Sequence, residues 1–218
     1  MHTMCPFTWA ALRALSLCNC PEAANPAAAP PISRPQRTAV KRESRRDAAL
    51  REAAAAQLTL HPHDQILEVG FGAGDTLGAL LARAPQGRVS GVECSMELVT
   101  QAARRHQFSI KAGRLELEQA DVEALPYEYA RFHKVLAATD YVEWKNPEPC
   151  LIELQRVMQA GGQLVIGLPL KTRLRWASAA DGFTLEEAQE VAGLVRWVGF
   201  QAVEFTQGDG WACVMATR

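Results

Sequence analysis

Residues 65–76 read Gln-Ile-Leu-Glu-Val-Gly-Phe-Gly-Ala-Gly-Asp-Thr, and this stretch decides the fold. Its first five residues form a short apolar run that predicts a buried strand, and the glycines that follow end that strand. An amphipathic segment comes next, with Leu77, Leu80 and Leu81 on one helical face. The stretch therefore predicts a strand, a glycine-rich turn and a helix in direct succession.

Short apolar runs and amphipathic segments alternate along the rest of the chain. Such alternation predicts a parallel sheet with helices on both faces. Two runs separated by a Gly-Asp-Gly turn close the chain and predict an antiparallel hairpin. Strands are expected over 65–69, 88–93, 114–120, 133–139, 163–169, 201–207 and 211–217, and helices over 76–84, 95–106, 148–159 and 185–198.

Helix-capping residues support several of these helices. Ser95 is a plausible N-cap of the second helix after the turn, and Thr184 with Glu187 forms the pattern of a capping box. The pair Gly161-Gly162 is expected to end the helix over 148–159.

The first sixty residues differ in composition from the rest. Residues 1–40 are rich in Ala, Pro and Arg, and we expect them to form a disordered extension. Residues 41–60 contain strong helix formers and charges at helical spacing, so they predict a leading helix with a solvated, basic face. The domain itself is expected to span residues 41–218.

Charge and cysteine usage restrict the partners. The chain has a formal net charge of −1, and the part after residue 60 is mildly acidic, so nucleic acid is not an expected partner. The six cysteines lack the spacing of a zinc site, so we expect no metal, reduced thiols and a cytoplasmic location. No apolar run approaches the roughly 20 residues of a membrane helix, so no membrane span is expected. The oligomeric state is not indicated.

Two acidic residues accompany the glycine-rich turn. Glu68 precedes the three alternate glycines, and Glu93 ends the next strand roughly twenty residues later, where a carboxylate can accept ribose hydroxyls. A nicotinamide fingerprint requires a small residue where this chain has Asp75, and it would place Glu68 near a pyrophosphate. These acids favour a cationic ligand such as a sulfonium cofactor, and a nicotinamide oxidoreductase is the alternative.

These motifs resemble the class I S-adenosylmethionine-dependent methyltransferase superfamily, in particular its type 11 domains, over roughly residues 60–218. The resemblance implies S-adenosylmethionine as the cofactor. It implies an α/β fold, a Rossmann-like three-layer sandwich whose seven-stranded, mostly parallel sheet has the order 3-2-1-4-5-7-6 with the last strand antiparallel. The segments that carry the resemblance are ILEVGFGAGDT (66–76), VECSMELV (92–99), QADVEALPY (119–127) and LIELQRVMQAGGQLVIG (151–167).

The resemblance also implies a set of cofactor-binding residues. Glu68 would lie near the amino group of the methionine part, and Glu93 near the ribose. Cys94 and Met96 would lie near adenine, and Asp121 would face the exocyclic amine of adenine. The full implied set is Glu68, Gly70, Phe71, Gly72, Gly74, Glu93, Cys94, Met96, Asp121, Val122 and Ala138.

The predicted function is methyl transfer to an unidentified acceptor, for which a small molecule is the leading expectation. Some relatives carry an Asn-Pro-Pro-aromatic signature after the strand expected over 133–139, where the present sequence has Asp140 and Tyr141. The lack of that signature argues against methylation of adenine or glutamine amino groups. No catalytic residue is assigned. Residues 169–183 are a candidate acceptor region. A nicotinamide oxidoreductase and a non-catalytic partner subunit on the same fold are the alternative functions.

Overall fold

The computed structural model describes residues 45–171 and 182–218, all within one unit that spans residues 38–218. The extension expected over 1–40 lies outside the described residues. The strands are β1 (Gln65–Val69), β2 (Arg88–Glu93), β3 (Leu115–Gln119), β4 (Phe132–Ala137), β5 (Met158–Pro169), β6 (Gln201–Gly208) and β7 (Trp211–Thr217). The helices are α1 (Arg45–Ala56), α2 (Asp75–Arg83), α3 (Met96–Arg105), α4 (Gln107–Lys111), the 3-10 helix η2 (Asp140–Glu143), α5 (Pro147–Val157) and α6 (Leu185–Val198).

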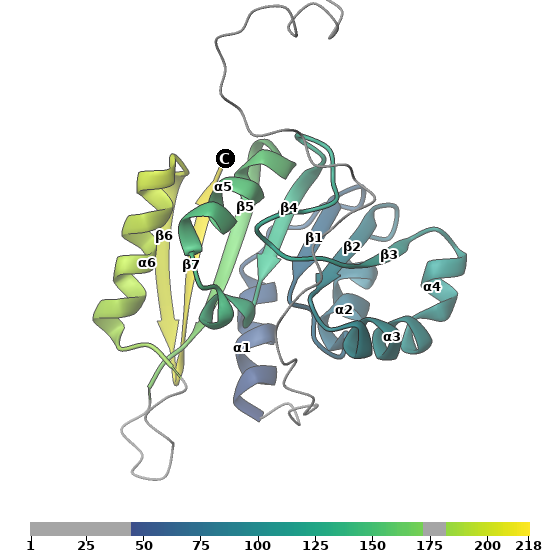
Figure 1. Ribbon diagram of the computed structural model, residues 1–218, viewed down its shortest axis with the longest axis horizontal. Helices are drawn as coiled ribbons and strands as arrows, with labels where there is room; N and C mark the ends of the chain where they lie inside the picture. Colours follow the sequence, from purple (N-terminus) through teal and green to yellow (C-terminus); the bar gives the residue numbers. More distant parts are fainter. Residues whose placement is uncertain (1–44, 172–181) are drawn as a thin grey trace, which may run out of the picture. The chain divides into compact units, whose positions relative to one another are not determined.

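The strands form one sheet in the order β3-β2-β1-β4-β5-β7-β6 (Figure 1). Neighbours pair in parallel from β3 to β5, and β7 is antiparallel to both β5 and β6. The strand order and the antiparallel last strand confirm the predicted topology. In this order the chain turns from one side of the sheet to the other between β1 and β4, which makes that point the topological switch point.

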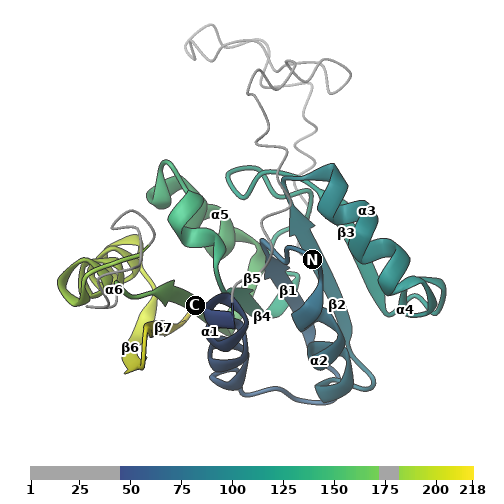
Figure 2. The same cartoon turned by 90° about the horizontal axis from the view of Figure 1, so that it is seen from below.

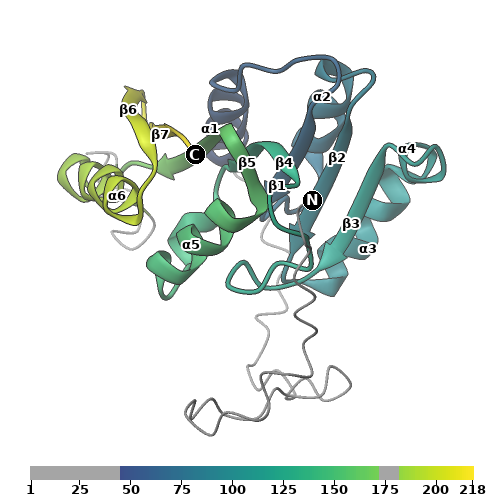
Figure 3. The ribbon, with the colours of Figure 1, turned by 90° about the horizontal axis from the view of Figure 1, so that it is seen from above.

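Helices cover both faces of the sheet. Helices α1 and α2 lie on one face and α5 and α6 on the other (Figures 2 and 3). Because side chains alternate along a strand, Ile66 and Leu136 pack with the α1–α2 layer, whereas Leu67 and Val135 pack with the α5–α6 layer. This period-two pattern builds two apolar cores, one on each side of the sheet.

Helix α1 packs closely against the sheet. Leu50 is 1% exposed, and its Cδ1 atom lies 3.0 Å from the position that a Cβ atom on Gly167 of β5 would take. Ala54 is also fully buried. The apolar face of this leading helix is therefore part of the core.

The start of β5 differs from the sequence-based prediction. Helix α5 ends at Val157, and β5 begins at once with Met158, which pairs with Phe132 of β4. Gly161 and Gly162 therefore lie inside the strand, beside a register shift, and do not end the helix. The expectation that they end it was wrong because burial of Met158 in the sheet starts the strand before the glycines.

Two capping predictions are confirmed. The Ser95 side chain accepts a hydrogen bond from the Leu98 amide at the start of α3, and Thr184 and Glu187 form a complete capping box on α6. Within residues 45–171 and 182–218, no helix is long and apolar enough to cross a membrane.

Candidate active site

The glycine loop follows β1 at the switch point of the sheet. Gly70, Gly72 and Gly74 have φ angles of 65°, 57° and 81°, a left-handed region that glycine adopts far more readily than other residues. The Gly70 amide donates to the Val92 carbonyl at 2.8 Å, which holds the loop against β2. Ligands in open α/β sheets bind beyond the carboxyl ends of the strands at this point.

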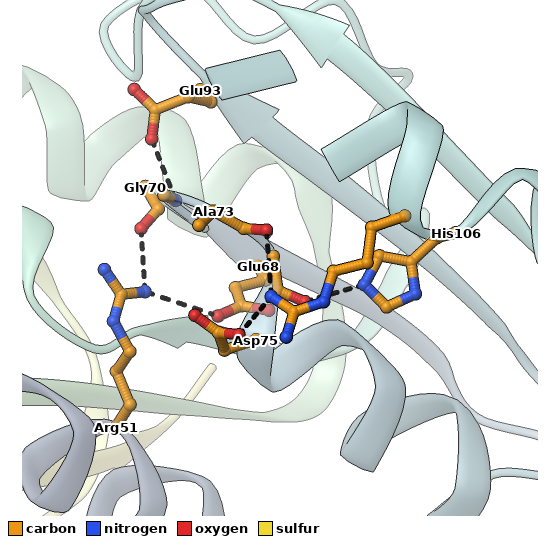
Figure 4. Close-up of polar contacts among 10 residues, drawn as sticks. Arg51, Glu68, Gly70, Ala73, Asp75, Glu93 and His106 are labelled. Atoms are coloured by element: carbon orange, nitrogen blue, oxygen red, sulfur yellow. Dashed lines mark hydrogen bonds and ion pairs between the residues drawn. The ribbon is translucent and has the colours of Figure 1, made fainter. Parts of the chain in front are cut away.

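Glu93 organises the loop from the end of β2. Its Oε2 accepts the Gly72 amide at 3.0 Å (Figure 4). Its Oε1 accepts the Ser95 amide at 3.1 Å and the Cys94 thiol at 3.3 Å. These three bonds use three of the roughly four acceptor positions of a carboxylate. Glu93 is therefore fixed in orientation and keeps acceptor capacity for a ribose hydroxyl.

Arg51 reaches the glycine loop from α1. Its Nη1 donates to the Gly70 carbonyl at 3.2 Å and lies 3.9 Å from Oε1 of Glu68 (Figure 4). Glu68 is fully buried in β1, and the Arg51 side chain is only 13% exposed. The solvated-face interpretation of this helix is therefore wrong for Arg51, which points inward. The direct contact of Glu68 with a cofactor remains a prediction.

The far end of the loop is held from the end of α3. His106 Nε2 lies 2.7 Å from the Gly74 carbonyl, within hydrogen-bonding distance, and Arg105 pairs with Asp75 at the start of α2 (Figure 4). Neither residue was predicted for the site from sequence. Asp75 places a carboxylate at a helix N-terminus, where a dinucleotide fold would bind its pyrophosphate.

The Phe71 side chain points away from the loop and into the core. It is fully buried, and its ring atoms lie 2.6 and 3.0 Å from the position that a Cβ atom on Gly91 of β2 would take. The glycine at residue 91 makes room for this ring. Phe71 therefore offers a ligand its backbone only.

We expect Phe71→Leu to lower stability with little effect on cofactor affinity. The smaller side chain loses part of the contact with Gly91, at a cost of about 1–2 kcal/mol. Urea unfolding measures the stability, and isothermal titration with S-adenosylmethionine is expected to give a Kd within about threefold of wild type. A larger loss of affinity in the folded variant would show that the ring shapes the loop.

Residues expected near adenine lie together at the ends of β2 and β3. The Gln119 side-chain amide donates to the Cys94 carbonyl at 3.0 Å, which joins the two strand ends. Cys94 and Met96 are exposed, and Asp121 is exposed in a turn where it accepts an amide from two residues further along. Val122 is buried. The structure therefore brings these four residues to one edge of the site.

Ala138 lies at the carboxyl end of β4 and is buried. Its carbonyl oxygen would be 2.3 Å from a Cβ atom on Gly167, so the backbone of the two strands approaches closely there. Its methyl group packs in the core on the α1 side of the sheet. A contact with the cofactor remains a prediction for this residue.

Asp140 was not assigned to cofactor binding from sequence, and it contacts the glycine loop. Its Cβ, Cγ and Oδ1 atoms lie 2.4 to 2.5 Å from the position that a Cβ atom on Gly70 would take. Its Oδ2 accepts a hydrogen bond of 2.8 Å from Nε1 of Trp144. The absence of a side chain at Gly70 is therefore what allows the carboxyl group to rest on the loop.

The pKa of Asp140 is raised from 3.8 to about 6, and burial is the largest cause. The Trp144 hydrogen bond and the Arg51 guanidinium oppose this shift, while the negative charges of Glu93 and Glu143 contribute to it. The carboxyl group is therefore poised between its two protonation states near neutral pH.

The raised pKa of Asp140 predicts a pH-dependent stability. A proton bound more tightly in the folded state stabilises the protein fully below about pH 4, and this contribution is lost as the pH rises through about 6. Relative to Asp140→Asn, which stays neutral, the wild-type unfolding free energy is expected to fall by about 2–3 kcal/mol between pH 4 and pH 7. Urea unfolding at several pH values measures this difference. A difference independent of pH would contradict the raised pKa.

A cavity of about 560 Å³ adjoins Asp140 through the next residue, Tyr141. Its apolar wall includes a cluster of aromatic rings in which Tyr141 contacts Trp144 and Phe183 at centroid distances of 4.9 and 5.9 Å. Helix α6 contributes Leu194 to another wall. Tyr141 thus lines the cavity directly after Asp140, whose carboxyl group rests on Gly70.

The fold and the loop agree with comparisons to known proteins. Residues 66–162 match the family described as a methyltransferase domain. A crystal structure of an S-adenosylmethionine-dependent methyltransferase from Aquifex aeolicus superposes with a TM-score of 0.66 at 20% identity, covering 76% of this chain and 88% of that one. Residues 66–162 belong to the methyltransferase domain family, and the chain has the fold of the class I S-adenosylmethionine-dependent methyltransferases. The family's cofactor is S-adenosylmethionine, so the nicotinamide alternative was wrong.

The alignments with sequence relatives span different shares of this chain and of each relative. The chain is 26% identical over 148 residues to the uncharacterized methyltransferase YdaC of Bacillus subtilis, which is 68% of this chain and 77% of the relative. It is 34% identical over 123 residues to the demethylmenaquinone methyltransferase of Deinococcus radiodurans, which is 55% of this chain and 49% of the relative. The chain spans about half the length of several curated relatives that it matches.

The residues of the methyltransferase loop fit this cofactor. Any side chain at Gly70 would collide with Asp140, so a glycine is what allows the loop and the Asp140 carboxyl group to lie together at this point. Glu93 offers acceptor capacity for a ribose, and the carboxylates around the loop suit a ligand with positive charge. S-adenosylmethionine would be held by the glycine loop and Glu93, and it supplies an electrophilic methyl group on a sulfonium.

Proposed function

We propose that the protein transfers a methyl group from S-adenosylmethionine to a small molecule with an apolar or aromatic part. The observation that carries this proposal is the 560 Å³ cavity that Tyr141 of η2 lines, with its wall of three aromatic rings. A cavity of this size suits a small-molecule ligand. The relatives include a demethylmenaquinone methyltransferase and an O-methyltransferase of Pyrenophora dematioidea, which supports such an acceptor.

The residues of this site act in the proposed reaction by positioning. Methyl transfer from a sulfonium requires the acceptor atom, the methyl carbon and the sulfur to lie in line, and such orientation contributes about 7–11 kcal/mol. Asp140 and Tyr141 are consecutive residues of η2. The Asp140 side chain lies against Gly70 of the glycine loop, and Tyr141 lines the cavity. The short helix η2 therefore couples the cofactor loop to the acceptor cavity.

The proposal is tested with S-adenosylmethionine that carries a labelled methyl group. A cell extract is separated into small-molecule and macromolecular fractions, and each is incubated with the protein. Label in a small molecule supports the proposal, whereas label found only in macromolecules contradicts the acceptor class. Binding of S-adenosylmethionine without transfer to either fraction would favour a non-catalytic partner subunit.

Filling the cavity is expected to separate cofactor binding from methyl transfer. Leu194→Trp places a large ring in the cavity, so transfer is expected to fall at least about tenfold while the Kd for S-adenosylmethionine stays within about twofold. Gly193→Trp is the matched control, because a Cβ atom at this exposed neighbour on α6 meets nothing within 4 Å. Equal activity of both variants would place the acceptor elsewhere.

A further inference from the structure

Asp140 lies where ligands of this fold bind, yet none of the sequence motifs includes it. It is the first residue of η2 and follows β4, and its carboxyl group rests on Gly70 at the end of β1. The switch point of the sheet lies between these two strands. A ligand that extends from Glu93 across the loop therefore reaches Asp140.

The surroundings of Asp140 favour a cationic ligand. Glu93 and Glu143 disfavour its negative charge, and the nearby thiols of Cys94 and Cys150 have pKa values raised to about 12, so they are neutral. The positive charge of Arg51 offsets only part of the effect of burial and of the two glutamates on the Asp140 carboxylate. A positive group placed next to the carboxylate would stabilise its ionised form.

Glu68 is less well placed for the same role. It is fully buried within β1, and its carboxylate lies 3.9 Å from Arg51 on the α1 side of the loop. Asp140, in contrast, lies on the loop and adjoins the cavity through Tyr141. Asp140 is therefore better placed than Glu68 to contact the positive group of a ligand.

We propose that Asp140 binds the ammonium group in the amino-acid part of S-adenosylmethionine. An ammonium group is a compact cation with three donors and pairs well with a carboxylate. Arg51 contacts the Gly70 carbonyl and supplies the opposite charge near the same glycine, which suits a ligand with both an ammonium and a carboxylate. This inference rests on the proposed function, and its test distinguishes the two.

Three ligands isolate the group that Asp140 contacts. S-adenosylhomocysteine keeps the amino-acid part and lacks the sulfonium charge, and 5′-methylthioadenosine lacks both. In isothermal titrations at pH 7, Asp140→Asn is expected to weaken S-adenosylmethionine and S-adenosylhomocysteine by about tenfold or more and 5′-methylthioadenosine by less than about twofold. Glu148→Gln removes an exposed carboxylate from the first turn of the next helix, α5, and is expected to leave all three affinities unchanged.

Each of the other outcomes would contradict either the ammonium contact or the proposed function. Equal weakening of all three ligands by Asp140→Asn would show a structural effect on the loop. A loss confined to S-adenosylmethionine would assign Asp140 to the sulfonium and contradict the ammonium contact. Unchanged binding of all three would remove Asp140 from the site and leave the proposed function intact. Failure of the wild-type protein to bind either amino-acid ligand would overturn the proposed function itself.

A second measurement uses only the wild-type protein, so it tests the inference even if Asp140→Asn fails to fold. Because the pKa of Asp140 is about 6, its carboxyl group must lose a proton when the ammonium binds at lower pH. The affinity for S-adenosylhomocysteine is therefore expected to fall about tenfold from pH 7 to pH 5. The affinity for 5′-methylthioadenosine is expected to stay constant, and a parallel fall of both would contradict the inference.

Discussion

Replacing Gly70 with alanine is expected to weaken the binding of S-adenosylmethionine at least about a hundredfold. Gly70 has a φ angle of 65°, which strains any residue with a side chain, and the new Cβ atom would lie 2.4 Å from Cβ of Asp140. The loop or η2 must therefore move at the point where the cofactor crosses the sheet. Isothermal titration measures the affinity, and circular dichroism confirms that the variant is folded.

The matched control for this substitution is Gly78→Ala. Gly78 lies within α2, and a Cβ atom there would be 3.6 Å from Cε1 of His106, an ordinary contact. Alanine favours a helix over glycine by about 0.5–1 kcal/mol, so this variant is expected to be slightly more stable and to bind the cofactor normally. Normal binding by Gly70→Ala would contradict the assignment of the loop.

Removing the Arg51 guanidinium is expected to destabilise the fold by about 3–5 kcal/mol. Arg51→Met keeps much of the packing of the side chain, but it removes the hydrogen bond to the Gly70 carbonyl and the positive charge beside buried Glu68. A buried carboxylate that loses a compensating charge is costly. Urea unfolding at pH 7 measures the free energy of unfolding.

A double-mutant cycle separates the charge effect from packing. Glu68→Gln removes the buried charge, so Arg51→Met is expected to destabilise this background much less than it destabilises the wild-type protein. Glu52→Gln, at the exposed neighbouring position on α1, is the control and is expected to change stability by less than about 0.5 kcal/mol. An equal effect of Arg51→Met in both backgrounds would show that its packing alone matters.

The main lines of the fold were predictable because they depend on local patterns. The alternation of apolar runs with amphipathic segments predicted the sheet, and the closing hairpin predicted its antiparallel strand. Gly161 and Gly162 were misread because a glycine pair serves equally at a helix end and in a bulged strand. Only the pairing of Met158 with β4 distinguishes the two, and that contact joins residues far apart in the sequence.

The cofactor loop was predictable for a similar reason, since Glu68, the glycines and Glu93 lie at fixed spacing around one turn. Arg51 and Asp140 reach the same loop from segments outside that spacing. Arg51 stands in a helix with several other charged residues, and nothing in the sequence distinguishes its inward side chain from its solvated neighbours. Their roles follow only from the way α1 and η2 pack on the switch point.

The contact between Arg51 and the loop affects where this protein can be divided. The family match begins at residue 66, after α1 has ended. A fragment that began at residue 66 would lack the donor to the Gly70 carbonyl and would expose the surface of β5 that Leu50 covers. The smallest unit that keeps the loop in its binding geometry therefore begins at or before α1, and boundaries drawn from family similarity alone would remove it.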